Sequence, residues 1–334
     1  MVSESQLQAA ARRLAAGELV AFPTETVYGL GARADDDAAV AKVFAAKGRP
    51  TDHPLIVHVA DAAHAQAFAA EWSPLAERLV AAFWPGPLTL IVPRRDGVAR
   101  AAAGGAPTIG LRCPAHPIAH ALLVACADAG VPGVAAPSAN RFGRISPTTA
   151  GHVRTEFGAA VEVLDGGPCE VGIESAIVDV SRGVPVLLRP GALARAEIEA
   201  AAGAPLAAPD AGAPRASGTL EAHYAPRARL RLMPAKSLAD AITVWVEARA
   251  QASTSKQAAP TLAVYSRTVR VPRAAGLVAR RMPETARAAA HELFAVLREI
   301  DAQGVALIWV EQLPPGPEWD GVRDRLQRAA AASP

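Results

Sequence analysis

The sequence predicts an α/β protein with a mixed sheet, followed by a smaller α/β domain. Short apolar runs alternate with amphipathic stretches between residues 5 and 190, which is typical of strands and helices packed in layers. Some expected strands are separated by too little chain for a parallel crossover, so antiparallel pairs should also be present. A break rich in Ala, Pro, Gly and Ser then precedes a second alternating segment.

The first region opens with a helix over residues 5–16, which Gly17 is placed to end. A second helix should begin at Asp35–Asp37, where acidic side chains favour the helix dipole, and end at Gly48. Further helices are expected at 74–83, 117–129 and 148–157. The expected strands are the short apolar runs at 19–23, 55–59, 88–93, 109–112, 134–136, 177–180 and 186–188.

The second region has the same alternation on a smaller scale. Its expected strands are 230–233, 261–265 and 305–310, its expected helices are 238–250, 284–300 and 318–331, and 251–260 is expected to be a loop. This pattern predicts a three-layer, Rossmann-like α/β domain. We therefore expect a first domain at 1–202, a linker at 203–228 and a C-terminal domain at 229–334.

The composition is that of a globular protein, with 51% apolar and 20% charged residues. A formal net charge of +2 does not indicate a polyanion-binding surface, so any phosphate contact must come from local clusters. The three cysteines show no CxxC spacing, which favours reduced thiols over disulfides or zinc. Without a recognisable signal peptide or a membrane-spanning run, we expect a cytoplasmic protein that does not bind membranes.

Two motifs resemble known sites but fit them poorly. Gly29, Gly31 and Ala34 match the loose dinucleotide fingerprint, but the expected strand ends at Pro23, six residues before the first glycine. His116 and His120 are one helical turn apart and could share a metal, yet no carboxylate or third histidine lies nearby in sequence. We therefore expect neither a nicotinamide site nor a metal site made of protein side chains.

Cationic residues stand at the ends of several expected elements. Lys47, Gly48 and Arg49 lie where a helix ends, so their side chains should project from a turn. They could simply complement the negative end of the helix dipole. However, Arg112 and Arg189 each end a strand, where ligand crevices form in open sheets. Because guanidinium groups bind phosphate or carboxylate in a bidentate fork, these positions indicate an anionic ligand.

Small polar residues follow other strands. Ser138 and Asn140 come after an apolar run and could either bind a phosphate or cap the next turn. His53 and His58 flank one strand and could both reach one cleft. No Ser/His/Asp order or carboxylate pair indicates hydrolysis, and Glu25 and Glu174 are isolated in the sequence. The inventory is better suited to holding and neutralising charge than to covalent catalysis.

Taken in order, the motifs resemble one family, the YrdC-like threonylcarbamoyl-AMP synthases, in the longer form with an extra C-terminal domain. The resemblance rests on motifs spread over nearly the whole chain, at residues 22–30, 47–50, 53–58, 84–89, 110–112, 137–140, 172–175, 188–191, 223–226, 265–267, 281–283 and 324–326. It implies a YrdC-like twisted open sheet with a basic concavity in the first domain.

The resemblance also implies a reaction. The family joins L-threonine, bicarbonate and ATP into threonylcarbamoyl-AMP, releasing pyrophosphate, and partner proteins use this intermediate to make threonylcarbamoyladenosine in tRNA. Mg²⁺ would be held by the triphosphate, and tRNA contact is possible at the concavity. Two other readings stay open: a non-catalytic RNA-binding module, and a carbamoyltransferase using a ready-made carbamoyl donor.

The family's functional positions can be transferred where the motifs match. In the K-x-R and S-x-N signature, Lys47 and Arg49 would neutralise charge in catalysis. The ATP contacts implied are Lys47, Arg49, His53, Thr108, Ser138, Asn140, Arg144, Arg189 and Tyr224, and the threonine contacts are Thr26, His58, Arg112, Ala136 and Ser175. Tyr224 lies in a linker that would fold over the active site. Before it, the chain has Gly218-Thr219-Leu220 where the family has a Gly-Met or similar pair.

Overall fold

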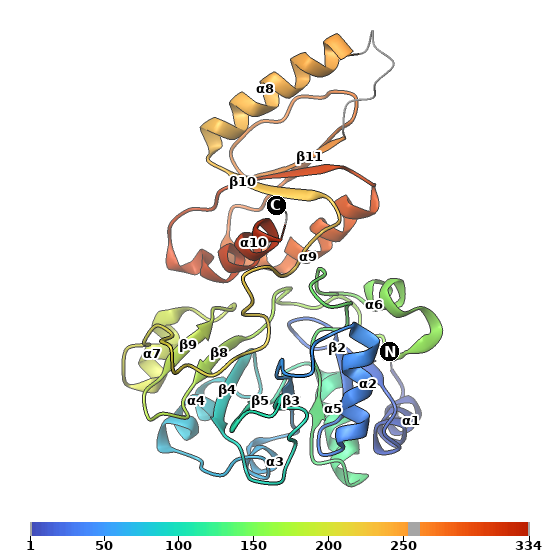
Figure 1. The fold of residues 1–334 in the computed structure, drawn as a ribbon, viewed down its shortest axis with the longest axis vertical. Coiled ribbons are helices and arrows are strands. Elements are labelled where there is room, and N and C mark those ends of the chain that lie inside the picture. Colours follow the sequence, from blue (N-terminus) through green and yellow to red (C-terminus); the bar gives the residue numbers. More distant parts are fainter. Residues whose placement is uncertain (1, 253–260, 333–334) are drawn as a thin grey trace. The chain divides into compact units, whose positions relative to one another are not determined.

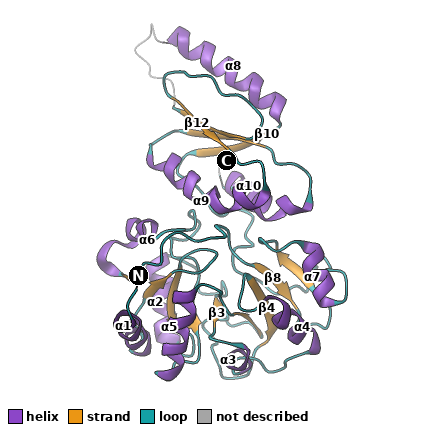
Figure 2. Cartoon of the chain, turned by 180° about the vertical axis from the view of Figure 1, so that it is seen from behind, coloured by secondary structure: helices purple, strands orange, loops and turns teal. Residues whose placement is uncertain are grey.

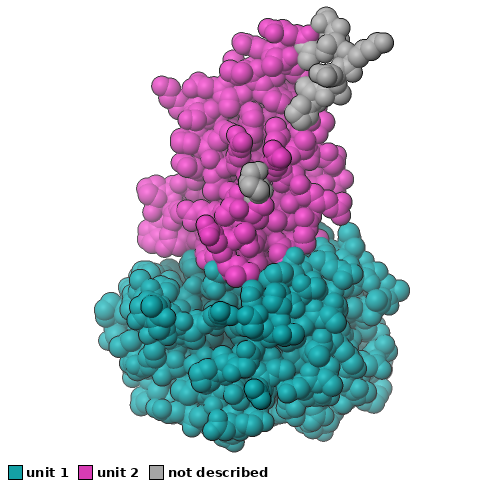
Figure 3. All heavy atoms as spheres, viewed as in Figure 1, with its two compact units in different colours: residues 1–142, 146–219 teal, residues 143–145, 220–334 magenta. Residues whose placement is uncertain are grey.

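The computed structural model describes residues 2–252 and 261–332. The chain forms two compact units, one made of residues 1–142 and 146–219 and the other of residues 143–145 and 220–334 (Figure 3). The division between them at Thr219 and Leu220 falls inside the expected linker. Each unit is described by itself below.

Unit 1 is built on a mixed sheet, as the sequence predicts, with nine strands in the described part of the chain. Their order across the sheet is β7-β1-β2-β6-β3-β5-β4-β8-β9. The strands are β1 (Val20–Phe22), β2 (Gly29–Arg33), β3 (Ile56–His58), β4 (Leu88–Pro93), β5 (Thr108–Arg112), β6 (Val134–Ala135), β7 (Glu162–Val163), β8 (Ala176–Asp179) and β9 (Val186–Arg189). The sheet contains parallel pairs such as β3 with β5 and antiparallel pairs such as β4 with β5.

Helices cover this sheet and are capped as their sequences suggest. They are α1 (Glu4–Ala15), α2 (Asp37–Lys47), α3 (Ala62–Gln66), α4 (Pro74–Phe83), α5 (Pro117–Asp128), α6 (Ala150–Phe157) with the 3₁₀ turn η1 (Gly158–Ala160), and α7 (Arg195–Ala202). Helices α1 and α5 lie side by side (Figures 1 and 2), and their facing residues Leu14, Leu122 and Cys126 are fully buried. Burial of these apolar side chains stabilises the layer at roughly 25 cal/mol per Å² removed from water.

Unit 2 contains a smaller sheet whose four described strands are all parallel, in the order β10-β13-β11-β12. They are β10 (Arg229–Met233), β11 (Leu262–Ser266), β12 (Leu277–Arg281) and β13 (Leu307–Glu311). Helix α8 (Ala235–Ala252) lies on one face, and α9 (Ala286–Ala302) and α10 (Asp320–Ala331), preceded by η2 (Pro317–Trp319), lie on the other (Figures 1 and 2). This is the three-layer domain that the sequence predicts.

The expected elements recur with boundary shifts of a few residues, and the structure also contains short elements that the sequence does not predict. The structure adds β2, β7, β12, α3 and α7. Gly29 and Gly31, considered above as part of a fingerprint, lie within β2, which pairs with β1 and β6. Residues 253–260 of the expected loop 251–260 lie outside the described residues, while Gln251 belongs to α8.

Candidate functional site

Lys47 is the last residue of α2, and its amino group joins two motifs that are about ninety residues apart in the chain. Asp36 caps the start of α2, and Gly48 ends it in the left-handed conformation, with φ of 64°. From this position Lys47 Nζ donates to the carbonyl oxygens of Ser138, at 2.5 Å, and Asn140. The Lys47 side chain therefore ties the K-x-R motif to the S-x-N motif.

The expectation that Lys47 projects from a turn is wrong, because the residue is only 3% exposed. Burial, and to a smaller degree the nearby Arg49 charge, lower the pKa of Lys47 well below its ordinary value. Main-chain carbonyls replace the water that a surface lysine would bind. An anion reaching this amino group would favour its charged form.

Arg49 and His53 surround one aromatic ring, that of Phe142. Arg49 Nη2 donates to the carbonyl oxygen of Pro54 at 3.0 Å, and its guanidinium lies 5.6 Å from the centre of the Phe142 ring. The His53 ring meets Phe142 edge-on with 5.5 Å between the ring centres. Burial and the Arg49 charge lower the pKa of His53, so it is neutral at pH 7. The sequence prediction missed Phe142, whose only signal was its place two residues after Asn140.

The segment from Ala136 to Ser138 follows β6 beside β2 and β3, and the chain bends at residues 139 and 140. Ala136 N donates to Ile56 O at 2.9 Å, and Ser138 forms an isolated bridge with Gly29. The Asn140 side-chain amide donates to Arg141 O at 2.7 Å. Lys47, Arg49, His53, Ser138 and Asn140 therefore lie together, and their binding of one ligand stays a prediction.

A second cluster of buried polar groups is centred on Arg112 at the end of β5. Its guanidinium donates from Nη1 to Thr26 Oγ1 at 2.9 Å and from Nε to Gly86 O at 3.2 Å. His58 is the register partner of Arg112 on β3. Burial, with the Arg112 charge beside it, lowers the pKa of His58 to about 3, so its imidazole is neutral at pH 7.

Glu25 also belongs to this cluster, although it is isolated in the sequence. Its Oε1 lies 2.7 Å from Arg112 Nη2, and both residues are buried. The signal available in the sequence was a single acidic residue between two threonines in an otherwise apolar stretch. Its partner stands 87 positions later, which no local pattern indicates.

Ser175 connects this cluster with Arg189 at the end of β9. Its hydroxyl is 2.8 Å from Thr89 Oγ1, and Arg189 donates to Ser175 O from Nε at 3.1 Å and from Nη2 at 2.9 Å. The register of the strands places Thr89 beside Arg112, because Leu90 pairs with Leu111. His58, Arg112, Ser175 and Arg189 therefore follow one another across neighbouring strands.

Thr108 begins β5 and lies at the opposite end of that strand from Arg112. Four residues of extended chain separate the two by about 13 Å. Thr108 therefore lies toward Pro54, whose carbonyl oxygen accepts from Arg49. The sequence-predicted residues thus form two groups, one around Lys47 and one around Arg112.

The part of the expected linker that belongs to unit 1 packs against the same sheet. Ala213 and Ala216 contact a cluster formed by Ile56, Ile91, Ile177, Val186 and Leu188. Arg189 Nη1 donates to Ser217 O at 2.7 Å, and Arg215 pairs with Asp52 at 2.8 Å. The chain at 212–219 is therefore fixed next to residues of both groups.

Arg144 and Tyr224 belong to unit 2, and each contacts other residues of that unit. Arg144 Nη2 lies 3.4 Å from Asp301 Oδ2. Tyr224 is buried, has a φ of 61°, and stacks 5.3 Å from Phe294, with the Arg325 guanidinium 5.6 Å from its ring centre. Their assignment to ATP remains a prediction.

Other candidate sites have ordinary structural roles. His116 caps α5, its Nδ1 accepting from Ile118 N at 3.2 Å, as an N-cap histidine does. Among residues 2–252 and 261–332, no three His, Cys, Asp or Glu side chains are grouped to hold a metal ion. No helix of the described residues is long and apolar enough to cross a membrane.

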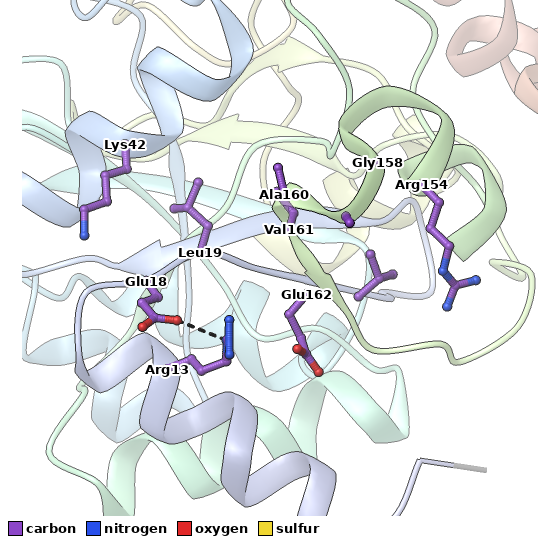
Figure 4. Close-up of a pocket in the computed structure, with 11 residues that line it drawn as sticks. Arg13, Glu18, Leu19, Lys42, Arg154, Gly158, Ala160, Val161 and Glu162 are labelled. Atoms are coloured by element: carbon purple, nitrogen blue, oxygen red, sulfur yellow. Dashed lines mark ion pairs between the residues drawn. The ribbon is translucent and has the colours of Figure 1, made fainter.

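A hollow of about 700 Å³ lies at the edge of the sheet of unit 1, beside β7 (Figure 4). Its cations already have partners: Arg13 pairs with Glu18 at 3.1 Å, Lys42 donates to a carbonyl oxygen, and Arg154 pairs with Asp165. None of the sequence-predicted site residues lines it. The size of this hollow therefore does not make it the functional site.

Two family models match the chain, one in each half. Residues 12–191 match the family described as "Telomere recombination", which groups Sua5, YciO and YrdC, and residues 193–331 match the family described as "Threonylcarbamoyl-AMP synthase, C-terminal domain".

Curated relatives named threonylcarbamoyl-AMP synthase are similar over much of the chain. That of Pyrococcus abyssi is 43% identical over 235 residues, 69% of this chain and 68% of the relative. That of Bacillus subtilis is 42% identical over 238 residues, 69% and 67% of the two chains. That of Schizosaccharomyces pombe is 33% identical and covers 93% of this chain and 85% of its own.

Solved structures resemble the whole chain. The P. abyssi Sua5 complexed with L-threonine has a TM-score of 0.86 and 35% identity, covering 100% of this chain and 96% of that one. A doubly substituted P. abyssi Sua5 gives 0.87 and 34%, with 99% and 94% covered. The chain therefore belongs to the threonylcarbamoyl-AMP synthase family, in the long form with the additional C-terminal domain.

Proposed function

We propose that this protein joins L-threonine, bicarbonate and ATP into threonylcarbamoyl-AMP and pyrophosphate. The observation that carries the proposal is the hydrogen bonding of Lys47 to the carbonyls of Ser138 and Asn140, which assembles the family's two signature motifs into one cationic site. The Arg112 cluster, on neighbouring strands, supplies a second site, whose charged and polar groups suit an amino-acid substrate. Family membership agrees with both.

The chemistry needs two anions to approach each other. The threonine α-ammonium loses a proton, and the resulting amine combines with bicarbonate to form a carbamate and water. A carbamate oxygen then attacks the α-phosphorus of ATP and expels pyrophosphate. Cations held rigidly beside both reactants lower this barrier by positioning and charge neutralisation. We assign this catalytic role to Lys47 and Arg49.

The remaining residues would bind the two substrates. We assign to ATP the side chains of Lys47, Arg49, His53, Thr108, Ser138, Asn140, Arg144, Arg189 and Tyr224. We assign to threonine Thr26, His58, Arg112 and Ser175, with the backbone at Ala136. The guanidinium of Arg112, fixed by Thr26 and Gly86, suits the substrate carboxylate. Residues 212–219, fixed beside both groups, support a linker at 203–228 that folds over the active site.

Mg²⁺ would reach this site with the nucleotide. No group of three acidic, histidine or cysteine side chains in the described residues fits a metal ion by itself. Triphosphate oxygens and water are the ligands that Mg²⁺ prefers. We therefore propose that the triphosphate holds the ion and that Lys47 and Arg49 neutralise the remaining phosphate charge.

We also propose a cytoplasmic enzyme whose product is passed to proteins that modify tRNA, with tRNA contact possible. The buried free thiols of Cys113, Cys126 and Cys169 suit a reducing compartment.

The decisive experiment measures pyrophosphate release from ATP with threonine and bicarbonate added separately and together. Release that requires both supports the proposal. Folded protein that releases none would contradict it, and turnover driven by carbamoyl phosphate without threonine would indicate a carbamoyltransferase instead. RNA binding without any turnover would indicate a binding module.

A further inference from the structure

The Arg112 cluster contains a buried carboxylate for which the reaction above has no role. Glu25 is 6% exposed and Arg112 is 3% exposed, and Glu25 Oε1 lies 2.7 Å from Arg112 Nη2. Two neighbours already orient the guanidinium, since Thr26 and Gly86 accept from Nη1 and Nε. Arg112 is therefore held in place by contacts other than Glu25.

The carboxylate has unused hydrogen-bonding capacity. Within the described part of the chain, neither Glu25 oxygen accepts a hydrogen bond of good geometry, and Oε2 has no ion-pair partner. A buried carboxylate normally has its acceptor sites filled, because desolvating it without partners is costly. The imidazole of His58, the register partner of Arg112, does not supply a positive charge to the cluster, because its pKa of about 3 keeps it neutral. The vacant acceptor sites therefore suit a cationic donor from a ligand.

Threonine carries such a donor. At neutral pH its carboxylate and its α-ammonium stand on one carbon, so a buried site must supply a cation and an anion side by side. Arg112 and Glu25 have this arrangement. We propose that Glu25 binds the α-ammonium of threonine while Arg112 binds its carboxylate, an inference that rests on the proposed function.

This contact would make the pocket selective for amino acids over other carboxylates. Arg112 alone would attract any small carboxylate, whereas Glu25 repels those that lack a neighbouring positive charge. The Arg112–Glu25 pair carries no net charge, and neither does zwitterionic threonine. Threonine would thus enter without leaving an unbalanced charge in the buried site.

The test compares two ligands that differ by the amino group. L-threonine and (R)-3-hydroxybutanoate, which is threonine without that group, are titrated into the full-length protein and its Glu25→Gln variant by calorimetry. Wild type should bind threonine on the order of 10- to 100-fold more tightly than 3-hydroxybutanoate. In Glu25→Gln this preference should disappear, with 3-hydroxybutanoate bound at least as well as by wild type. Glu25→Asp, which keeps the charge, should restore part of it.

Asp179→Asn is the matched control, because Asp179 is also a buried carboxylate that pairs with an arginine, Arg182. It is the last residue of β8, whereas Ser175 precedes the first. This variant should leave both affinities unchanged. If Glu25 only positions Arg112, Glu25→Gln weakens both ligands equally, and the proposal is overturned. Equal affinity of wild type for the two ligands overturns it without any variant. Wild type that binds neither ligand would contradict the proposed function instead.

Discussion

Replacing Lys47 by methionine should damage ATP binding and folding together, because this lysine is both a buried cation and a structural donor. Methionine keeps most of the side-chain length but removes the ammonium. Loss of one charge-assisted contact with the triphosphate corresponds to about 1.5–3 kcal/mol, or roughly 10- to 150-fold weaker ATP binding. The carbonyls of Ser138 and Asn140 also lose their donor.

The stability effect follows from these two carbonyls, of which Ser138 O keeps a second donor, Asn140 N at 2.9 Å. A buried acceptor left without a partner costs about 1–3 kcal/mol, and relief from burying an ammonium offsets part of this. We expect the free energy of unfolding to fall by about 1–3 kcal/mol. Lys42→Met is the matched control, since Lys42 lies on the same helix and donates a single hydrogen bond, to Gly17 O at 2.7 Å. It should leave ATP binding unchanged.

The assays are ATP titration by calorimetry, pyrophosphate release, and urea unfolding. Because burial lowers the pKa of Lys47, the folded chain binds this proton less readily than the unfolded chain. The free energy of unfolding should therefore fall as the pH drops from the ordinary pKa of lysine through the lowered pKa of Lys47. ATP binding in that range should take up a proton, which buffers of different ionisation enthalpy reveal. Unchanged ATP affinity in a folded Lys47→Met would refute the phosphate role.

Three further outcomes are expected. Because the pKa of His58 is lowered to about 3, its contribution to stability is present above pH 6.5 and is lost as the pH falls toward 3, at up to ~1.4 kcal/mol per unit; urea unfolding of His58→Gln should lack this slope. Gly191→Ala should unfold at least 5 °C lower, since a Cβ would stand 2.3 Å from a backbone nitrogen of β8, whereas Gly151→Ala in α6 should be neutral or stabilising. Asp301→Asn should destabilise unit 2 by about 1–3 kcal/mol, because its carboxylate accepts from two backbone N–H groups. An Asp301→Asn melting curve that matches wild type would contradict this.

The fold could be predicted wherever local sequence and tertiary structure agree. Helix α2 begins at an acidic cap and ends at Gly48, a position that needs a left-handed residue. Strand β2 shows the opposite case, because its glycines have low strand propensity. A Cβ at Gly31 would lie 2.7 Å from Val134 Cγ1, so close packing between strands selects glycine there. That reason is visible only in three dimensions.

The candidate site shows the same limit. The cations of the site could be selected from the sequence because they stand at the ends of helices and strands. The groups that surround each cation could not be predicted. The sequence predicts Lys47 at the surface, but it is buried, because its carbonyl partners lie about ninety residues away in the chain. Glu25 is isolated in the sequence, and the fold brings its partner Arg112 to it. Long-range pairing of charges leaves no local pattern in the sequence.

The way each cation is held distinguishes the two groups of the site. Lys47 Nζ and Arg49 Nη2 are oriented by main-chain carbonyl oxygens, which carry no net charge. Such a site remains attractive to a polyanion. Arg112 instead faces the carboxylate of Glu25, and a site with both signs of charge suits a zwitterion. The backbone therefore prepares one group for a triphosphate, and a buried ion pair prepares the other for an amino acid.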